Sequence, residues 1–174
     1  LILSTCLLGF AALPVWAAPA LTPIPAQMTV GEGTFTLSDT TQIYVPAGDA
    51  ELMGVAVWLR DMLKETRGLT LEISDAAPAE SEKAIRLNRI QTLVAEDNEA
   101  YHLSVSDEGV TIGAVSRAGI FYGAVTLWQL ATPDVAKGAV ALPAVSIFDT
   151  PRFKWRGLMI DSVRHFQSPE EIKR

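Results

Sequence analysis

Three side chains near the end of the sequence combine residue types that bind polar ligands and transfer protons. Asp161, Arg164 and His165 follow the short apolar run 157–160, and a helix-start signal over 168–171 comes next. In a β/α unit, functional side chains lie where the strand ends and the loop begins. The pattern therefore predicts a strand over 157–160 whose carboxyl end carries a ligand-binding cluster.

The spacing within this cluster allows two interpretations. Arg164 has five N–H donors in a fixed fork and can bind vicinal hydroxyls or a carboxylate. An ion pair between Arg164 and Asp161 that ties strand to loop fits the same spacing. Both interpretations stay open on the residues alone. Arg156 lies at the beginning of the predicted strand, where residues of a barrel usually serve stability, so we assign it a structural role.

Other residues capable of chemistry have simpler interpretations. Asp107 and Glu108 are adjacent carboxylates, but they interrupt the alternating run 101–112, which predicts a β-hairpin with a solvated turn. His102 falls on the polar face of that hairpin without an acidic or metal-binding partner at useful spacing. Cys6 is the only cysteine and lies in an apolar leader, so the sequence predicts neither a disulfide nor a metal site.

Charge and hydropathy limit the possible partners and the location. The 174-residue chain has a formal net charge of −6, which disfavours nucleic acid and anionic lipid as partners. Residues 1–17 carry no charge and resemble a secretory h-region with a cleavage site after Ala17. A membrane anchor is the alternative, but Pro14 interrupts the run, which is shorter than the ~20 residues of a membrane span. We expect a signal peptide, a secreted or periplasmic protein, and no membrane association after cleavage.

The part that follows, residues 18–150, predicts one α+β domain. Short β-prone runs at 34–37 and 42–45 predict two strands joined by a turn in an antiparallel arrangement. A helix is predicted between Asp49, an N-cap, and Gly68, which suits a left-handed stop. Later alternating runs predict half-buried strands, and therefore an antiparallel sheet covered by two helices.

A second helix is predicted after the cap residue Ser116, and no charged residue occurs over 118–131. One apolar stripe contains Ile120, Phe121, Ala124, Val125 and Trp128, while Leu127 and Leu130 lie outside it. A helix that is apolar nearly all round is buried on more than one side. We therefore expect this helix to lie between its own sheet and a second domain. Pro143 places the strand pieces over 140–147 at a sheet edge, because proline lacks a ladder donor.

Two runs resemble a known family. The run PRFKWRGLMIDSVRHFQSPEEIKR is similar to the entry into the catalytic barrel of family 20 glycoside hydrolases, the β-N-acetylhexosaminidases and chitobiases. The run SRAGIFYGAVTLWQLA resembles the Ser-x-x-Gly-x-Phe-Tyr-Gly helix of the α+β domain before that barrel. Over about residues 20–174, the resemblance implies a noncatalytic α+β domain over 18–150. The first strand and helix start of a truncated (β/α)8 barrel would follow over 151–174.

The resemblance also implies an activity. Family members are exo-β-N-acetylhexosaminidases that remove terminal nonreducing N-acetylglucosamine or N-acetylgalactosamine from oligosaccharides by substrate-assisted retaining catalysis, with no cofactor or metal. Arg164 matches the family arginine that binds the C3 and C4 hydroxyls, and Asp161 and His165 match positions that support it. The family's Asp-Glu pair lies in a downstream His-x-Gly-Gly-Asp-Glu motif that this sequence lacks. No catalytic residue is therefore assigned, and we expect the chain as given to be inactive.

Two alternatives remain open. In the first alternative, the upstream domain is a freestanding carbohydrate-binding or scaffolding module. In the second, it is the accessory domain of a different glycosidase. The nearly all-apolar second helix, the interrupted β/α unit and an aromatic content of 7% count against the first alternative. A downstream Asp-Glu pair that follows a strand would favour the hexosaminidase.

Overall fold

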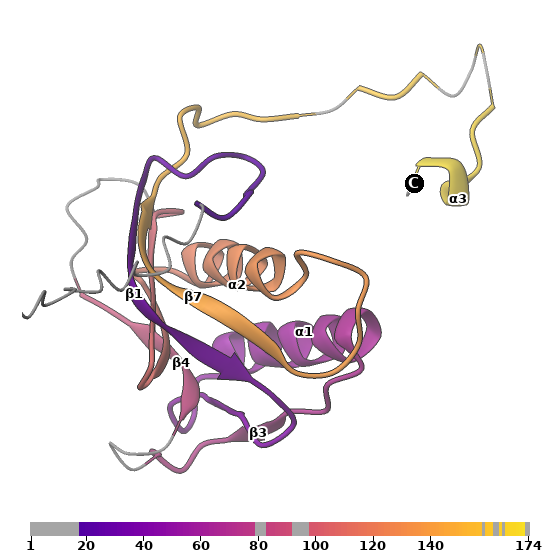
Figure 1. Cartoon of the computed structure of the whole chain (residues 1–174). Helices are drawn as coiled ribbons and strands as arrows, with labels where there is room; N and C mark the ends of the chain where they lie inside the picture. The colour runs from indigo at the N-terminus through magenta and orange to yellow at the C-terminus, as the bar shows by residue number, and fades with distance from the viewer. Residues whose placement is uncertain are drawn as a thin grey trace, which may run out of the picture.

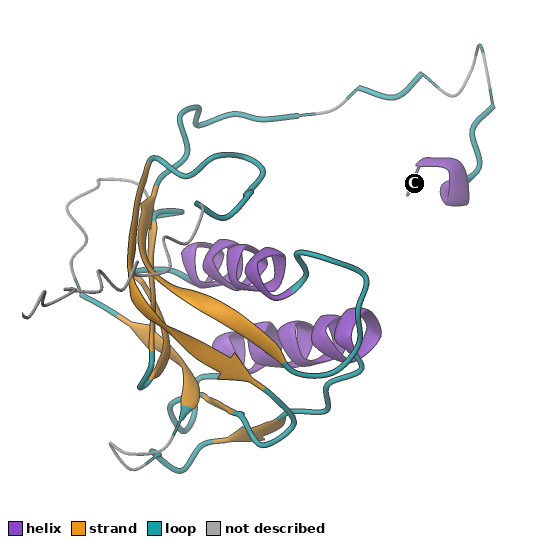
Figure 2. Ribbon diagram, in the orientation of Figure 1, coloured by secondary structure: helices purple, strands orange, loops and turns teal. Residues whose placement is uncertain are grey.

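The computed structural model describes residues 18–78, 83–91, 98–157, 159–161, 164 and 166–172. The predicted signal peptide and His165 lie outside the described residues. The described chain forms two layers, a seven-stranded sheet and two helices on one of its faces (Figures 1 and 2). In chain order the elements are β1 Gln27–Leu37, β2 Gln42–Tyr44, α1 Ala50–Arg67, β3 Glu72–Ser74, β4 Ala84–Arg89, β5 Tyr101–Ser106, β6 Gly109–Ala114, α2 Arg117–Ala131, β7 Val140–Asp149 and α3 Pro169–Ile172.

The sheet is mixed, so the prediction of an antiparallel sheet was wrong. Its strand order is β1-β7-β5-β6-β4-β2-β3. The first four strands in this order pair antiparallel, whereas β6, β4, β2 and β3 pair parallel. Parallel neighbours need a crossover connection, usually a helix. Here α1 is the crossover between β2 and β3, which makes these two strands parallel.

The predicted pairing of the first two strands was also wrong. β1 pairs with β7, and β2 lies on the other side of the sheet between β4 and β3. β1 has 11 residues and β7 has 10, whereas β2 has only 3. The long pair makes a longer ladder and brings Phe35 opposite Leu142, both of which are fully buried. Strand length therefore outweighs closeness in sequence.

Pro143 does not lie on an edge strand, which corrects another prediction. β7 is continuous through Pro143 and lies between β1 and β5. However, β5 pairs with β7 only from Val145 to Asp149, and the β1 register shifts between Val30 and Thr34, next to the partner of Pro143. The missing N–H of proline is tolerated because β5 does not extend beside it.

Helix α1 forms as its capping signals predict. The Asp49 side chain accepts a hydrogen bond from the Leu52 N–H at 3.0 Å, and Gly68 ends the helix at φ 75°. The predicted apolar face lies against the sheet: Leu52, Val55, Ala56, Leu59 and Leu63 are buried, and Met62 is half-buried. This face forms one half of the core.

Helix α2 is covered by the sheet and by α1, while the predicted cover by a second domain stays a prediction. Ser116 caps it by accepting from the Gly119 N–H at 3.2 Å. Its fully buried apolar side chains include Leu127, which the predicted stripe left out. The Phe121 ring packs edge-on against Trp58 of α1, with centroids 4.8 Å apart. The second cover of this face is therefore α1, which lies beside α2 in the same domain (Figure 1).

Residues after Asp149 leave the two-layer body and extend away from it (Figure 1). The predicted strand over 157–160 is not formed, since its described residues have no strand structure. A strand needs a neighbouring strand for its backbone hydrogen bonds, and the described chain provides none beside it. The predicted helix start is confirmed: Ser168 N donates to Glu171 Oε2 at 2.8 Å, and Glu171 N donates to Ser168 Oγ at 3.3 Å.

Candidate functional site

The structure brings Asp161 and Arg164 together in the part of the chain that follows Asp149, which we call the exit segment. Arg164 Nε lies 3.2 Å from Asp161 Oδ2, and the Arg164 N–H donates to Asp161 Oδ1 at 3.4 Å. The Arg164 side chain is 86% exposed and that of Asp161 is 45% exposed. An ion pair this exposed contributes at most ~1 kcal/mol to stability. Asp161 therefore orients a guanidinium whose other donors face solvent and are available to a ligand.

Large apolar side chains surround this pair along the chain. Phe153, Trp155, Met159 and Phe166 are each at least 71% exposed. Exposed apolar side chains gathered in one segment are typical of surfaces that contact another protein segment or a ligand. The exit segment thus combines an exposed guanidinium with several exposed apolar side chains.

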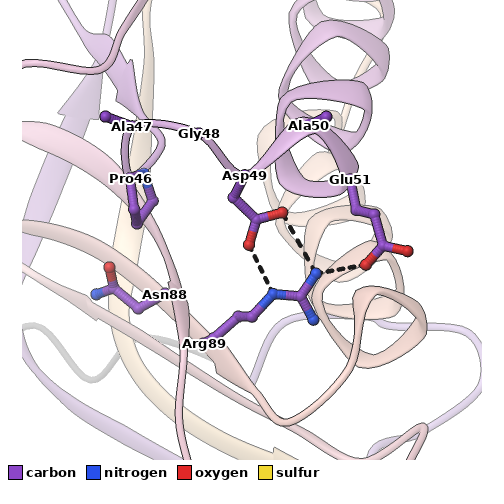
Figure 3. A pocket seen from close by; sticks show the side chains of 8 residues that line it. All are labelled: Pro46, Ala47, Gly48, Asp49, Ala50, Glu51, Asn88 and Arg89. Atoms are coloured by element: carbon purple, nitrogen blue, oxygen red, sulfur yellow. Dashed lines mark hydrogen bonds and ion pairs between the residues drawn. The ribbon is translucent and has the colours of Figure 1, made fainter.

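A second candidate is an open depression at the N-terminus of α1, which the sequence did not indicate (Figure 3). Its lining residues are Pro46, Ala47, Gly48, Asp49, Ala50, Glu51, Asn88 and Arg89. The carboxyl ends of the parallel strands β2 and β4 meet the helix start here, as at ligand sites of open α/β sheets. Only the pairing of β2 with β4 brings Arg89 to Asp49, which is 40 residues away in sequence.

One cation, Arg89, forms ion pairs with both carboxylates of this depression. Arg89 Nε lies 2.6 Å from Asp49 Oδ2, and Arg89 Nη2 lies 2.5 Å from Glu51 Oε2. The hydrogen bond from Arg89 lowers the pKa of Asp49, and the Leu52 N–H acts in the same direction. Bonds to Asp49 and Glu51 raise the pKa of Arg89. Asp49 thus stays ionised at neutral pH and cannot act as a general acid, so this cluster stabilises the helix start.

Two substitutions of Asp49 distinguish the contribution of its helix cap to stability from that of its ion pair with Arg89. We expect Asp49→Ala to lower the free energy of unfolding by about 1–2 kcal/mol, while Asp49→Asn keeps the cap. Folding lowers the pKa of Asp49, so its ion pair stabilises the fold above the unfolded pKa and is lost as pH falls through the folded value. Urea denaturation at about pH 7 and about pH 2.5 should show wild type and Asp49→Asn converging in acid. A constant difference between these two proteins at both pH values would contradict this account.

Asp107, Glu108 and His102 lie in the hairpin of β5 and β6. Asp107 and Glu108 are exposed in the turn between β5 and β6. His102 Nε2 lies 3.2 Å from Ser146 Oγ on β7. The described residues contain no group of three or more His, Cys, Asp or Glu side chains that could hold a metal ion. Within the same residues, no helix has the length and apolar character needed to cross a membrane.

The described fold is a mixed α+β domain, and a family comparison makes its class specific. The model of glycosyl hydrolase family 20, domain 2, matches residues 18–150. This match covers well over half of the chain. The chain therefore belongs to glycoside hydrolase family 20.

Curated relatives and solved structures agree with this assignment. A beta-hexosaminidase of Porphyromonas gingivalis is 36% identical over 157 residues, which cover 87% of this chain and 20% of the relative. A beta-N-acetylhexosaminidase of Cellulomonas fimi is 35% identical over 158 residues, covering 88% and 30%. The chain thus spans less than a third of the length of these relatives.

Among solved structures, the GH20 beta-N-acetylhexosaminidase of Streptomyces coelicolor A3(2) matches with a TM-score of 0.73 and 34% identity, covering 90% of this chain and 32% of that one. The GH20 exo beta-N-acetylglucosaminidase of Vibrio harveyi, in complex with N-acetylglucosamine, matches with a TM-score of 0.70 and 30% identity. That match covers 91% of this chain and 24% of the Vibrio chain. The two TM-scores show that both chains share the fold of the matched part.

Proposed function

We propose that this chain is the N-terminal portion of a secreted exo-β-N-acetylhexosaminidase that removes terminal nonreducing N-acetylhexosamine from oligosaccharides. Residues 1–17 act as the signal peptide, 18–150 form the noncatalytic domain, and 151–174 lead into the catalytic barrel. The observation that carries this proposal is the family match over 18–150. The Vibrio harveyi relative with bound N-acetylglucosamine supports the substrate class.

Arg164 is the residue of this chain that binds substrate in the proposed enzyme. Its fork of donors suits the paired C3 and C4 hydroxyls of a hexose, and its 86% exposure leaves the fork accessible. Asp161 holds the guanidinium through the 3.2 Å contact and so supports its orientation. His165 takes the same supporting role in the proposal.

The chemical step depends on groups outside this chain. In the proposed mechanism the 2-acetamido oxygen of the substrate attacks C1, an Asp stabilises the acetamido group, and the adjacent Glu protonates the leaving oxygen. The one adjacent Asp-Glu pair of the described chain, Asp107 and Glu108, is exposed in a hairpin turn and cannot serve. A chain with the present sequence should therefore give no release of chromophore from a β-N-acetylglucosaminide above a buffer blank.

Arg164→Ala in the full-length enzyme tests the binding role. We expect kcat/KM for a chromogenic N-acetylhexosaminide to fall at least about tenfold, because a hydrogen bond to a charged group contributes about 1.5–3 kcal/mol. The melting temperature should stay unchanged, since the Asp161 pair is exposed. Arg152→Ala, on the same exposed segment, is the matched control. Unchanged kinetics together with lost thermal stability would instead support a purely structural ion pair.

The depression of Figure 3 does not favour the alternative of a freestanding carbohydrate-binding module. Its lining residues include no aromatic ring, and Arg89, Asp49 and Glu51 are paired with one another. A ligand would have to break these pairs to bind there, at the cost of leaving partly buried charges unpaired.

A further inference from the structure

Arg156 fastens the exit segment to two different parts of the α+β body. Its Nη2 forms an ion pair with Glu99, which precedes β5, and its Nη1 donates to the Phe153 carbonyl at 2.7 Å. Its guanidinium carbon lies 5.9 Å from the ring centroid of Tyr122 on α2. The side chains of Arg156 and Glu99 are 42% and 33% exposed. We call Arg156, Glu99 and Tyr122 the exit clamp.

The beginning of the same segment is fixed by a second set of bonds. Asp149 Oδ1 accepts from the N–H groups of Ala26 at 2.9 Å and Thr150 at 3.0 Å. Asp149 Oδ2 accepts from the Tyr101 hydroxyl at 3.2 Å, which also bonds to Thr126 Oγ1 at 2.7 Å. Tyr101 is only 3% exposed. The segment from Asp149 to the exit clamp is therefore held at both ends.

Residues beyond the clamp make contacts close in sequence. Arg164 bonds to Asp161, and Ser168 bonds to Glu171. The exit clamp thus joins the described segment to the two-layer body ahead of Asp161 and Arg164. Its geometry depends on arginine, because a planar guanidinium can bind a carboxylate and a carbonyl at once while it lies over an aromatic ring.

We propose that Arg156 is a positioning residue: with Glu99 and Tyr122 it sets the direction in which the chain leaves the domain, and so places Arg164 in the substrate site. This inference rests on the proposed function. It gives the noncatalytic domain a role in substrate binding, as the base from which the binding segment starts. A small displacement of a positioning group can cost up to ~100-fold in rate, even when the change lies away from the chemistry.

The first test uses kinetics of the full-length enzyme. Arg156→Gln and Glu99→Gln should each lower kcat/KM severalfold. Because the two substitutions remove the same interaction, kcat/KM of the double variant should be no lower than that of the less active single variant. Arg156→Lys should recover part of the loss, since it keeps the charge. Arg60→Gln, which breaks the exposed pair with Asp61 on α1, is the matched control and should leave kcat/KM unchanged.

The second test separates positioning from general stability. In an Arg164→Ala background, Arg156→Gln should have little further effect on kcat/KM. Displacing position 164 lowers kcat/KM only while the side chain at that position binds substrate. Additive losses, or unchanged kinetics in Arg156→Gln, would overturn the positioning role. A wild-type enzyme without hexosaminidase activity would instead overturn the proposed function, and the positioning role with it.

A third test examines the clamp without relying on activity. Trypsin cleaves after Arg152 and Lys154, which lie between the two fixed ends of the segment. Glu99→Gln keeps both cleavage sites and should speed their cleavage in the native enzyme, whereas Arg60→Gln should not. Equal cleavage rates in wild type and Glu99→Gln would show that the exit clamp does not hold the segment.

Discussion

Gly119→Ala is expected to lower the free energy of unfolding by about 1–3 kcal/mol. A Cβ at this position would overlap the Ala100 carbonyl oxygen and lie 2.7 Å from Ala114 Cβ, so the backbone of α2 or the start of β5 would have to shift. The same substitution in an unhindered helix stabilises by about 1 kcal/mol, because glycine is a poor helix former. The close approach of α2 to the sheet therefore reverses the sign.

The control for this prediction lies in the other helix. At Gly54 of α1, a Cβ would meet nothing within 4 Å, so Gly54→Ala should raise stability slightly. Gly123→Ala should also destabilise, but less than Gly119→Ala, because its Cβ would overlap the buried Ile112 side chain at 2.5 Å and not the backbone. Urea denaturation of the three variants checks this order. Equal shifts for Gly119→Ala and Gly54→Ala would show that helix packing does not depend on Gly119.

Arg67→Met is expected to cost about 2–3 kcal/mol of unfolding free energy. Arg67 is 3% exposed and lies at the end of α1. Its Nη1 bonds to Asp134 Oδ1 at 2.6 Å, and its other nitrogens donate to the carbonyls of Gly138 at 3.3 Å and Ala139 at 3.4 Å. Methionine fills similar space but leaves these acceptors without their donor, so the loop between α2 and β7 loses part of its attachment to α1.

The matched control is again Arg60, this time as Arg60→Met. It shares the helix and the residue type, but its pair with Asp61 is exposed, so the loss should stay below about 1 kcal/mol. Thermal unfolding followed by circular dichroism measures both variants. Equal melting temperatures for Arg67→Met and Arg60→Met would contradict the account of Arg67 as the attachment point of the loop.

The run Ser116–Gly123 that carries the family resemblance now has a physical explanation. Ser116 caps α2, Gly119 and Gly123 allow the helix to approach β5 and β6, and Phe121 contacts Trp58 of α1. Tyr122, the remaining aromatic residue of the run, belongs to the exit clamp. One short helix segment therefore joins the sheet, the other helix and the chain's exit.

Local signals were sufficient for the elements whose stability is decided by neighbouring residues. The caps Asp49, Gly68 and Ser116, the turn at Asp107 and Glu108, and the helix start at Ser168 all form as predicted. Each depends on hydrogen bonds or backbone angles within about one turn of chain. The proposed binding residues Asp161 and Arg164 also meet, because they lie one helical turn apart in sequence.

Tertiary structure alone decided the features that depend on distant pairing. The sequence predicted strands but not their order, because an alternating pattern records which face is buried and not which strand lies alongside. For the same reason it missed the contact of α2 with α1 and the pair of Arg89 with Asp49. Arg156 shows the difference most clearly: its residue type and position suggested structure, and only the approach of Glu99 and Tyr122 defined what it holds in place.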